Sequence, residues 1–206
     1  MVGEASELTR RRYDRIAPVY DALEWVMELV FFRRWRRQLW DQVPAGRVLE
    51  VGVGTGKNLE HLRDEHQVVG IDLSPNMLAR AHRRAQELGV AVELREADAE
   101  DLPFDDASFD AVVASFVFCS VPDPVLGLRE VRRVLKPTGK LVLLEHVVSP
   151  NPVLAKLMNW LDFLPLHIWG AHIDRDTAAN VRAAGFPNVR VEARAARLVV
   201  LVDASG

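Results

Sequence analysis

Three glycines follow a short apolar run and are the residues of this sequence best suited to holding a ligand. They stand at positions 52, 54 and 56, in the stretch E-V-G-V-G-T-G that covers residues 50–56. Residues 47–51 have the composition of a buried parallel strand, so the glycines fall in the turn after it. Glycine tolerates left-handed backbone and lets the main chain approach a ligand closely. The spacing therefore predicts a cofactor site at the carboxyl end of a strand.

Two other cofactor motifs place glycines in such a turn, and the sequence departs from both. A P-loop has the pattern G-x-x-x-x-G-K-S/T, but Val51 stands at its first glycine and Asn58 follows Lys57. A dinucleotide site has G-x-G-x-x-G, whereas this turn has G-x-G-x-G. The tyrosine–lysine pair of a common dehydrogenase chemistry is also missing, because Tyr13 and Tyr20 both precede the first strand. These departures disfavour a nucleotide phosphate and a nicotinamide cofactor.

Apolar runs alternate with helical periodicities along most of the chain. The expected strands cover 47–51, 68–71, 90–94, 109–115, 140–147, 189–193 and 198–202. The expected helices cover 21–40, 57–65, 74–88, 124–135 and 176–184, with Ser74 and Pro75 opening the third and Gly89 ending it. This alternation predicts an α/β fold with a Rossmann-like, seven-stranded, mostly parallel sheet and helices on both faces. Such sheets bind ligands at the carboxyl ends of their strands.

Composition limits the classes of function. A net charge of −3 argues against nucleic-acid binding, which usually requires a strongly basic protein. The single cysteine, Cys119, excludes an internal disulfide, and with six scattered histidines it forms no metal-ligand pattern. The first residues lack the apolar core of a signal peptide, and no uncharged apolar run reaches the roughly 18 residues of a membrane span. We therefore expect a single cytoplasmic domain without a metal.

Five stretches, in order along the chain, carry a family resemblance. The stretch at 50–56 resembles the first motif of the class I S-adenosylmethionine-dependent methyltransferases. The others are G-I-D-L-S-P-N-M-L at 70–78, A-D-A-E-D-L-P-F at 97–104, S-F-D at 108–110 and R-V-L-K-P-T-G-K at 133–140. Thr138 replaces a frequent glycine in the last motif, in a turn away from the cofactor. The resemblance implies that the cofactor is S-adenosylmethionine.

The resemblance also implies how the first two motifs contact the cofactor. The backbone that lies against its methionine part is that of Gly52, Gly54 and Gly56. Glu50 orders this turn or meets the amino group through water. Asp72 takes the two ribose hydroxyls, for which a carboxylate with two acceptor oxygens is suited. The alternative for Asp72 is to cap the next helix, but Ser74 suits that position better.

The remaining cofactor contacts implied by the resemblance lie further along the chain. Leu73 and Met77 flank the adenine, while Asp98 with Ala99 hydrogen-bonds its amino group. Ser115, at the end of the expected strand 109–115, completes the cofactor site. The alternative for Asp98 is a helix cap.

The N-terminal segment narrows the subfamily. The stretches Y-D-R-I-A-P-V-Y-D at 13–21 and F-R-R-W-R at 32–36 resemble the lead-in of quinone C-methyltransferases and of bacterial phosphatidylethanolamine N-methyltransferases. In both groups this segment is a lid, which implies that the Tyr20 hydroxyl reaches the methionine end of the cofactor. Residues 145–147, E-H-V, are nearer to thiol and small-molecule methyltransferases. We expect a small hydrophobic or lipid-like acceptor, a phospholipid amine or a quinol, with a thiol or other small molecule as the alternative.

The resemblance divides the single methyltransferase domain 1–206 into a helical lid at 1–45, a cofactor-binding core at 46–148, and a substrate segment with closing strands at 149–206. Within the lid, four arginines lie among four aromatic residues, a mixture found on helices at anionic membrane surfaces. These residues are Arg33, Arg34, Arg36, Arg37, Phe31, Phe32, Trp35 and Trp40. Two interpretations stay open: peripheral membrane contact, or aromatic residues in the core beneath a solvated arginine face.

A base is required only if the acceptor gives up a proton on methylation. His146, at the end of the expected fifth strand, is the best candidate, ahead of His167 and His172 in the substrate segment. The alternative for each is an ordinary packed or hydrogen-bonded histidine. A protein that binds the cofactor without turnover, as a sensor or partner subunit, is the rival class of function.

Overall fold

The computed structural model of the chain describes residues 3–28, 32–146, 175–194 and 199–205. The expected substrate segment, with His167 and His172, lies outside these residues.

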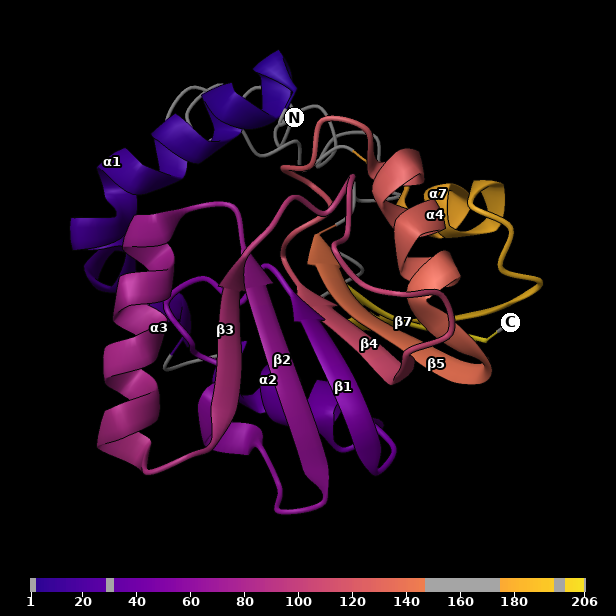
Figure 1. The fold of residues 1–206 in the computed structure, drawn as a ribbon, viewed down its shortest axis with the longest axis horizontal. Helices are drawn as coiled ribbons and strands as arrows, with labels where there is room; N and C mark the ends of the chain where they lie inside the picture. Colours follow the sequence, from indigo (N-terminus) through magenta and orange to yellow (C-terminus); the bar gives the residue numbers. More distant parts are fainter. Residues whose placement is uncertain (1–2, 29–31, 147–174, 195–198, 206) are drawn as a thin grey trace.

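A single seven-stranded sheet organises the described chain, in the order β3-β2-β1-β4-β5-β7-β6 (Figure 1). Its strands are β1 (Gly46–Val51), β2 (His66–Asp72), β3 (Val92–Glu96), β4 (Phe109–Ser115), β5 (Leu135–His146), β6 (Asn188–Arg194) and β7 (Val199–Ser205). All pairings from β3 to β5 are parallel, and β7 runs antiparallel to both β5 and β6. The expectation of a Rossmann-like, mostly parallel sheet is confirmed. Strand order reverses beside β1, where open α/β sheets bind ligands.

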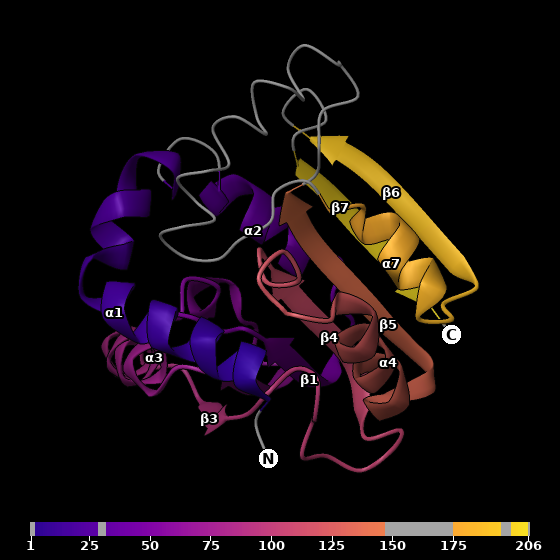
Figure 2. The ribbon, with the colours of Figure 1, turned by 90° about the horizontal axis from the view of Figure 1, so that it is seen from above.

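Helices cover both faces of this sheet (Figures 1 and 2). They are α1 (Glu4–Met27), α2 (Arg33–Trp40), the short 3₁₀ helix η2 (Leu59–His61), α3 (Pro75–Leu88), α4 (Pro124–Val134) and α7 (Thr177–Ala183). One core packs α4 and α7 against the sheet through Leu128, Val131, Val181, Leu49, Val112 and Leu141. The other packs α2 through Leu39, Trp40, Val48, Ala111, Val113 and Val142. Successive strand residues enter opposite cores because side chains alternate along a strand.

The N-terminal helix differs from the expectation. Helix α1 begins at Glu4 rather than in the expected stretch 21–40, and α2 is a separate element that begins at Arg33. The polar start is helical because Arg10 pairs with both Glu7 and Asp14, three and four residues away. The described apolar contacts of α1 with α3 come from Tyr13, Ile16, Ala17 and Tyr20, which lie beyond this polar start.

The segment after the glycine turn also differs, because the helix expected at 57–65 is reduced to η2. Leu62 is already extended, with ψ of 146°. The third expected helix is confirmed as α3, with the Ser74 hydroxyl accepting from the Met77 N–H and Gly89 ending it in the left-handed conformation. Strand β5 begins at Leu135, earlier than the expected 140.

Gly56 and Gly89 provide a matched test of packing at the glycine turn. Both have positive φ, 79° and 67°, so alanine is strained at each. A Cβ on Gly56 would lie 2.8 Å from Leu59 Cδ1 and 3.1 Å from Ala81 Cα, whereas one on Gly89 would meet nothing within 4 Å. We expect Gly89→Ala to lower the free energy of unfolding by about 1 kcal/mol and Gly56→Ala by at least about 2 kcal/mol. Urea denaturation with an unchanged slope measures both, and equal losses would contradict the packing argument.

Candidate cofactor and acceptor site

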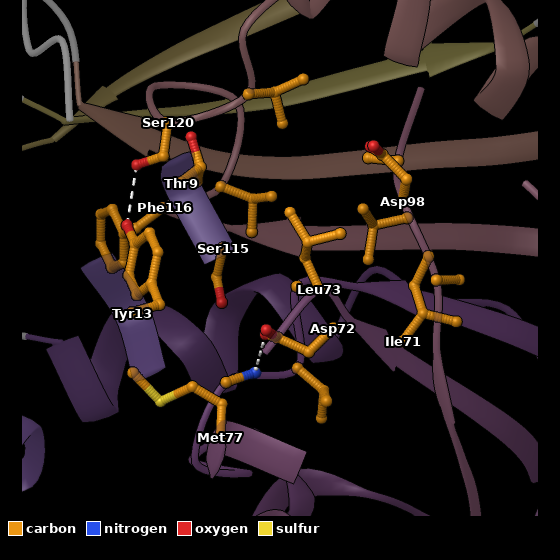
Figure 3. Close-up of a pocket in the computed structure, with 18 of the residues that line it drawn as sticks. Thr9, Tyr13, Ile71, Asp72, Leu73, Met77, Asp98, Ser115, Phe116 and Ser120 are labelled. Atoms are coloured by element: carbon orange, nitrogen blue, oxygen red, sulfur yellow. Dashed lines mark hydrogen bonds between the residues drawn. The ribbon is translucent and has the colours of Figure 1, made fainter. Parts of the chain in front are cut away.

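A pocket lies at the carboxyl ends of β1, β2 and β4, and residues of helix α1 line one side of it (Figure 3). The other walls are the glycine turn after β1, the end of β2, residues 97–99 and residues 115–122. About 880 Å³ of empty space lies within and in front of this pocket, a volume that includes open solvent at its mouth.

Asp72 ties the end of β2 to the glycine turn. Its Oδ2 accepts a hydrogen bond of 2.8 Å from the Gly54 N–H, and its Oδ1 accepts one of 2.9 Å from the Ser74 N–H. Burial raises the pKa of the Asp72 carboxyl to about 6, although both backbone donors favour its charged form. Gly52 has a φ of 67° and lies so close to Val117 that any side chain there would overlap it.

Glu50 lies behind the turn and does not line the pocket. The side chain is buried, its Oε1 accepts 2.7 Å from Asn58 Nδ2, and its Oε2 has no hydrogen-bond partner among the described residues. Burial raises the pKa of Glu50 to about 7. Asn58 also donates to Ser115 Oγ at 2.9 Å, and Arg36 Nη1 donates to the same oxygen at 2.6 Å. This network joins α2, β1 and the end of β4 beneath the pocket.

Two of the described residues that line the pocket are cations, and neither is among the residues that the family resemblance assigns to the cofactor. Arg36 is 6% exposed and Lys57 is 9% exposed. Glu28 lies between them, 3.1 Å from Arg36 Nε and 3.6 Å from Lys57 Nζ. Lys57 also lies 3.6 Å from Asp21 Oδ1 and 5.2 Å from the centre of the Tyr20 ring. These contacts tie the second half of α1 to the glycine turn.

The first half of α1 is held by α3. Asp14 Oδ1 accepts 2.6 Å from Ser74 Oγ, and the Asp14 carbonyl accepts 3.2 Å from Asn76 Nδ2. Ile16 and Ala17 are buried against Met77. Further along the pocket, Tyr13 shares a hydrogen bond of 2.8 Å with Ser120 (Figure 3).

The structure brings most of the predicted cofactor residues into this one pocket. Those that line it are Tyr20, Gly52, Gly54, Asp72, Leu73, Met77, Asp98, Ala99 and Ser115. Glu50 and Gly56 lie behind it, where Gly56 packs against Leu59 and Ala81. The helix-cap alternative for Asp98 is wrong, because no helix follows; its Oδ1 accepts 3.0 Å from the Glu100 N–H in a turn. His146 ends β5, and its role as a base stays a prediction.

Comparison with known proteins identifies the family. Residues 49–143 match a family model described as a methyltransferase domain. The chain is 37% identical over 168 residues to a ubiquinone/menaquinone biosynthesis C-methyltransferase from a Geobacter species, a match covering 77% of this chain and 72% of that protein. The chain belongs to the class I S-adenosylmethionine-dependent methyltransferases. The expectations of a methyltransferase enzyme and of S-adenosylmethionine as cofactor are thereby confirmed.

Two further likenesses place this methyltransferase more broadly. It is 44% identical over 113 residues to a phosphatidylethanolamine N-methyltransferase from Cereibacter sphaeroides, covering 54% of this chain and 56% of that protein. A solved S-adenosylmethionine-dependent methyltransferase from Thermotoga maritima superposes with a TM-score of 0.72 at 23% identity, covering 94% and 98% of the two chains. The second likeness supports the fold alone.

Two aromatic residues at the two ends of the arginine-rich helix α2 are buried in the methyltransferase. Phe32 is 6% exposed and Trp40 is 1% exposed, which fits the core interpretation for these two residues. Arg36 is also buried, whereas Arg34 and Arg37 are exposed. Phe31 lies outside the described residues. Within the described ranges, no helix is both long and apolar enough to cross a membrane.

The Glu50 carboxyl gives a pH dependence of stability that mutation can isolate. Because its folded-state pKa is raised from 4.5 to about 7, protonated Glu50 favours the folded state. That contribution is full below pH 4.5 and is lost as pH rises through 7. We expect Glu50→Gln to flatten the fall in unfolding free energy over this range by about 3 kcal/mol. Denaturation from pH 4.5 to 8 measures it.

The control is Glu87→Gln on the exposed face of α3, which should leave the profile of the cofactor-free protein unchanged. Parallel profiles for Glu50→Gln and the wild type would show that Glu50 stays charged in the fold throughout.

Proposed function

We propose that this methyltransferase passes the methyl group of S-adenosylmethionine to a small hydrophobic or lipid-like acceptor, such as a quinol or a phospholipid amine. The observation that carries the proposal is the extent of the likeness to the quinone C-methyltransferase. That match covers 77% of the chain, whereas the domain model covers only residues 49–143. Similarity to the quinone enzyme therefore extends beyond the residues that the general methyltransferase model matches.

The geometry of the pocket supports a definite placement of the cofactor. Asp72 would receive the ribose hydroxyls, because each of its oxygens accepts one backbone N–H and keeps a further lone pair. Leu73 and Met77 would flank the adenine, with Asp98 and Ala99 at its amino group.

The methionine part of the cofactor would then lie along the glycine turn. Gly52, Gly54 and Ser115 would contact it, while Glu50 and Gly56 support the turn from behind. Arg36 and Lys57, the cations among the described lining residues, suit its carboxylate. Tyr20, beside Lys57, would close this end.

Bound cofactor supplies a methyl group on a positively charged sulfur, which is already a good leaving group. The chain then has to align the acceptor atom with that methyl and exclude water, which α1 does by walling the pocket. On transfer, a bond to the acceptor atom would form as the bond between the sulfur and the methyl carbon breaks. For an acceptor that loses a proton, we retain His146 as the candidate base.

Peripheral contact with an anionic membrane is the further part of this proposal. Arg34 and Arg37 are exposed on α2 and could face such a surface, whereas Arg33 is paired with Glu60 at 2.9 Å. The balance of charges in the chain favours no nucleic-acid partner.

Transfer of label tests the proposal directly. Purified protein is incubated with methyl-labelled S-adenosylmethionine and a reduced short-chain quinone, a phosphatidylethanolamine or a small thiol. Label in the quinol or the phospholipid is the expected result. Label in the thiol alone would replace the lipid-like acceptor with a small molecule. Cofactor binding without transfer to any of them would favour a sensor or partner subunit.

Asp72 offers a test of the cofactor placement. Losing a charged acceptor of two hydroxyls should raise the dissociation constant for S-adenosylmethionine about 10- to 100-fold in Asp72→Ala, with a smaller rise in Asp72→Asn. Calorimetry measures it, at a temperature where denaturation shows each variant folded. The exposed Asp105→Ala serves as the control and should bind as the wild type does. An unchanged constant in Asp72→Ala would place the ribose elsewhere.

A further inference from the structure

One face of α1 carries a row of hydroxyl side chains into the pocket. Ser6, Thr9 and Tyr13 all line it, and their spacing of three and four residues puts them on the same side of the helix. In Figure 3, Thr9 and Tyr13 lie toward one end of the pocket, while Asp98 and Ile71 lie toward the other. The proposed cofactor contacts use none of these three hydroxyls.

Ser120 faces this row from the segment after β4. Its hydroxyl shares the 2.8 Å hydrogen bond with Tyr13, and its N–H donates to the Val117 carbonyl at 2.8 Å. The segment is fixed from below, because Glu145 Oε1 accepts from the N–H groups of Val117 and Phe118, each at 2.9 Å. Tyr13 and Ser120 are therefore held in place before any ligand arrives.

Phe116 at the start of this segment has a φ of 59°, a conformation that bulky side chains rarely adopt. Its N–H donates to the Leu144 carbonyl at 2.7 Å, and its ring packs on Phe32 with centroids 4.8 Å apart. Strained backbone of this kind persists where surrounding contacts impose it, often at a ligand site. Here it directs the chain from β4 along the pocket wall toward Ser120.

Ser6 supplies a second, independent observation. The residue is 1% exposed and lines the pocket, yet its Oγ has no hydrogen-bond partner among the residues that the structure describes. A buried hydroxyl without a partner is costly, and a ligand that hydrogen-bonds it removes that cost. Ser6 thus points to a ligand with a hydrogen-bonding atom at this end of the pocket.

The charge of the lining indicates what kind of ligand fits. The described lining residues from 6–13 and from 116–122 are all uncharged, and Val117, Val121 and Pro122 add apolar surface. The charged lining residues are Arg36, Lys57, Asp72 and Asp98, which belong to the proposed cofactor contacts. An ammonium or phosphate group in the hydroxyl-lined end would find no charged partner among the described lining residues there, so its desolvation would be unfavourable.

We propose that Ser6, Tyr13 and Ser120 form the acceptor subsite, and that it binds an uncharged hydroxyl or carbonyl oxygen carried by an apolar acceptor. The assignment rests on the proposed methyl transfer, since it takes the cofactor to occupy the other end of the pocket. The Tyr13–Ser120 pair orients the acceptor oxygen, and Ser6 gains the partner that it lacks.

Binding of a neutral acceptor analogue tests the subsite without requiring turnover. The probe is a dihydroxynaphthalene, which is titrated calorimetrically into the protein saturated with S-adenosylhomocysteine. The comparison probe, dihexanoyl phosphatidylethanolamine, is titrated in the same way. We expect the wild type to bind the dihydroxynaphthalene and not the zwitterionic lipid. Tyr13→Phe and Ser6→Ala should each weaken that binding at least tenfold, with affinity for S-adenosylhomocysteine unchanged within twofold.

Tyr20→Phe is the matched contrast, because the same hydroxyl is removed from the same helix at the cofactor end. Tyr20→Phe should lower affinity for S-adenosylhomocysteine and leave the binding of dihydroxynaphthalene to the saturated protein unchanged. Three results would overturn the subsite. They are unaltered dihydroxynaphthalene binding in Tyr13→Phe, an equal loss of affinity for S-adenosylhomocysteine in that variant, and a preference of the wild type for the phospholipid. If dihydroxynaphthalene binds as expected but the labelling assay shows no methyl transfer, the acceptor subsite is supported and the proposed turnover is rejected.

Discussion

The hydrogen bonds that Asp72 accepts are the contacts on which the rest of the site depends. One carboxylate binds the Gly54 N–H of the turn after β1 and the Ser74 N–H that precedes α3. A single side chain at the end of β2 therefore links the turn after β1 to the start of α3. Burial raises the pKa of Asp72, which means that its charge is costly in this position. The backbone donors favour that charge, and a ligand with hydroxyl groups would favour it further.

Ser74 connects Asp72 to helix α1, which lines one side of the pocket. Ser74 caps α3 and also donates to Asp14, which sets α1 along the start of that helix. With α1 in this position, Tyr20 lies at the cation-lined end of the pocket and Tyr13 lies against Ser120. The cofactor turn and the hydroxyl row thus belong to one connected set of polar contacts, although they are far apart in the sequence.

Much of this could be predicted from the sequence because it depends on local rules. The apolar runs of the parallel strands, the Ser74 cap and the Gly89 stop follow directly from strand and helix signals. Asp72 could be placed because a strand end is visible in the pattern. The burial of Arg36 could not, because its hydrogen bond to Ser115 joins residues 79 positions apart. The start of α1 could not be predicted for a related reason, since its first turns are mostly polar and the packing of Ile16 and Ala17 on Met77 joins segments far apart in the sequence.

The wall formed by α1 has a kinetic consequence. The helix contributes Ser6, Thr9, Tyr13 and Tyr20 to the pocket, and it is held by Asp14 and by the Tyr13–Ser120 bond. If products leave by displacement of this helix, the bonds that orient reactants must break once in every catalytic cycle. Stronger bonds between α1 and the rest of the pocket would then favour the chemical step but slow the release of products. Selection on this enzyme would therefore act on the compromise between these two rates.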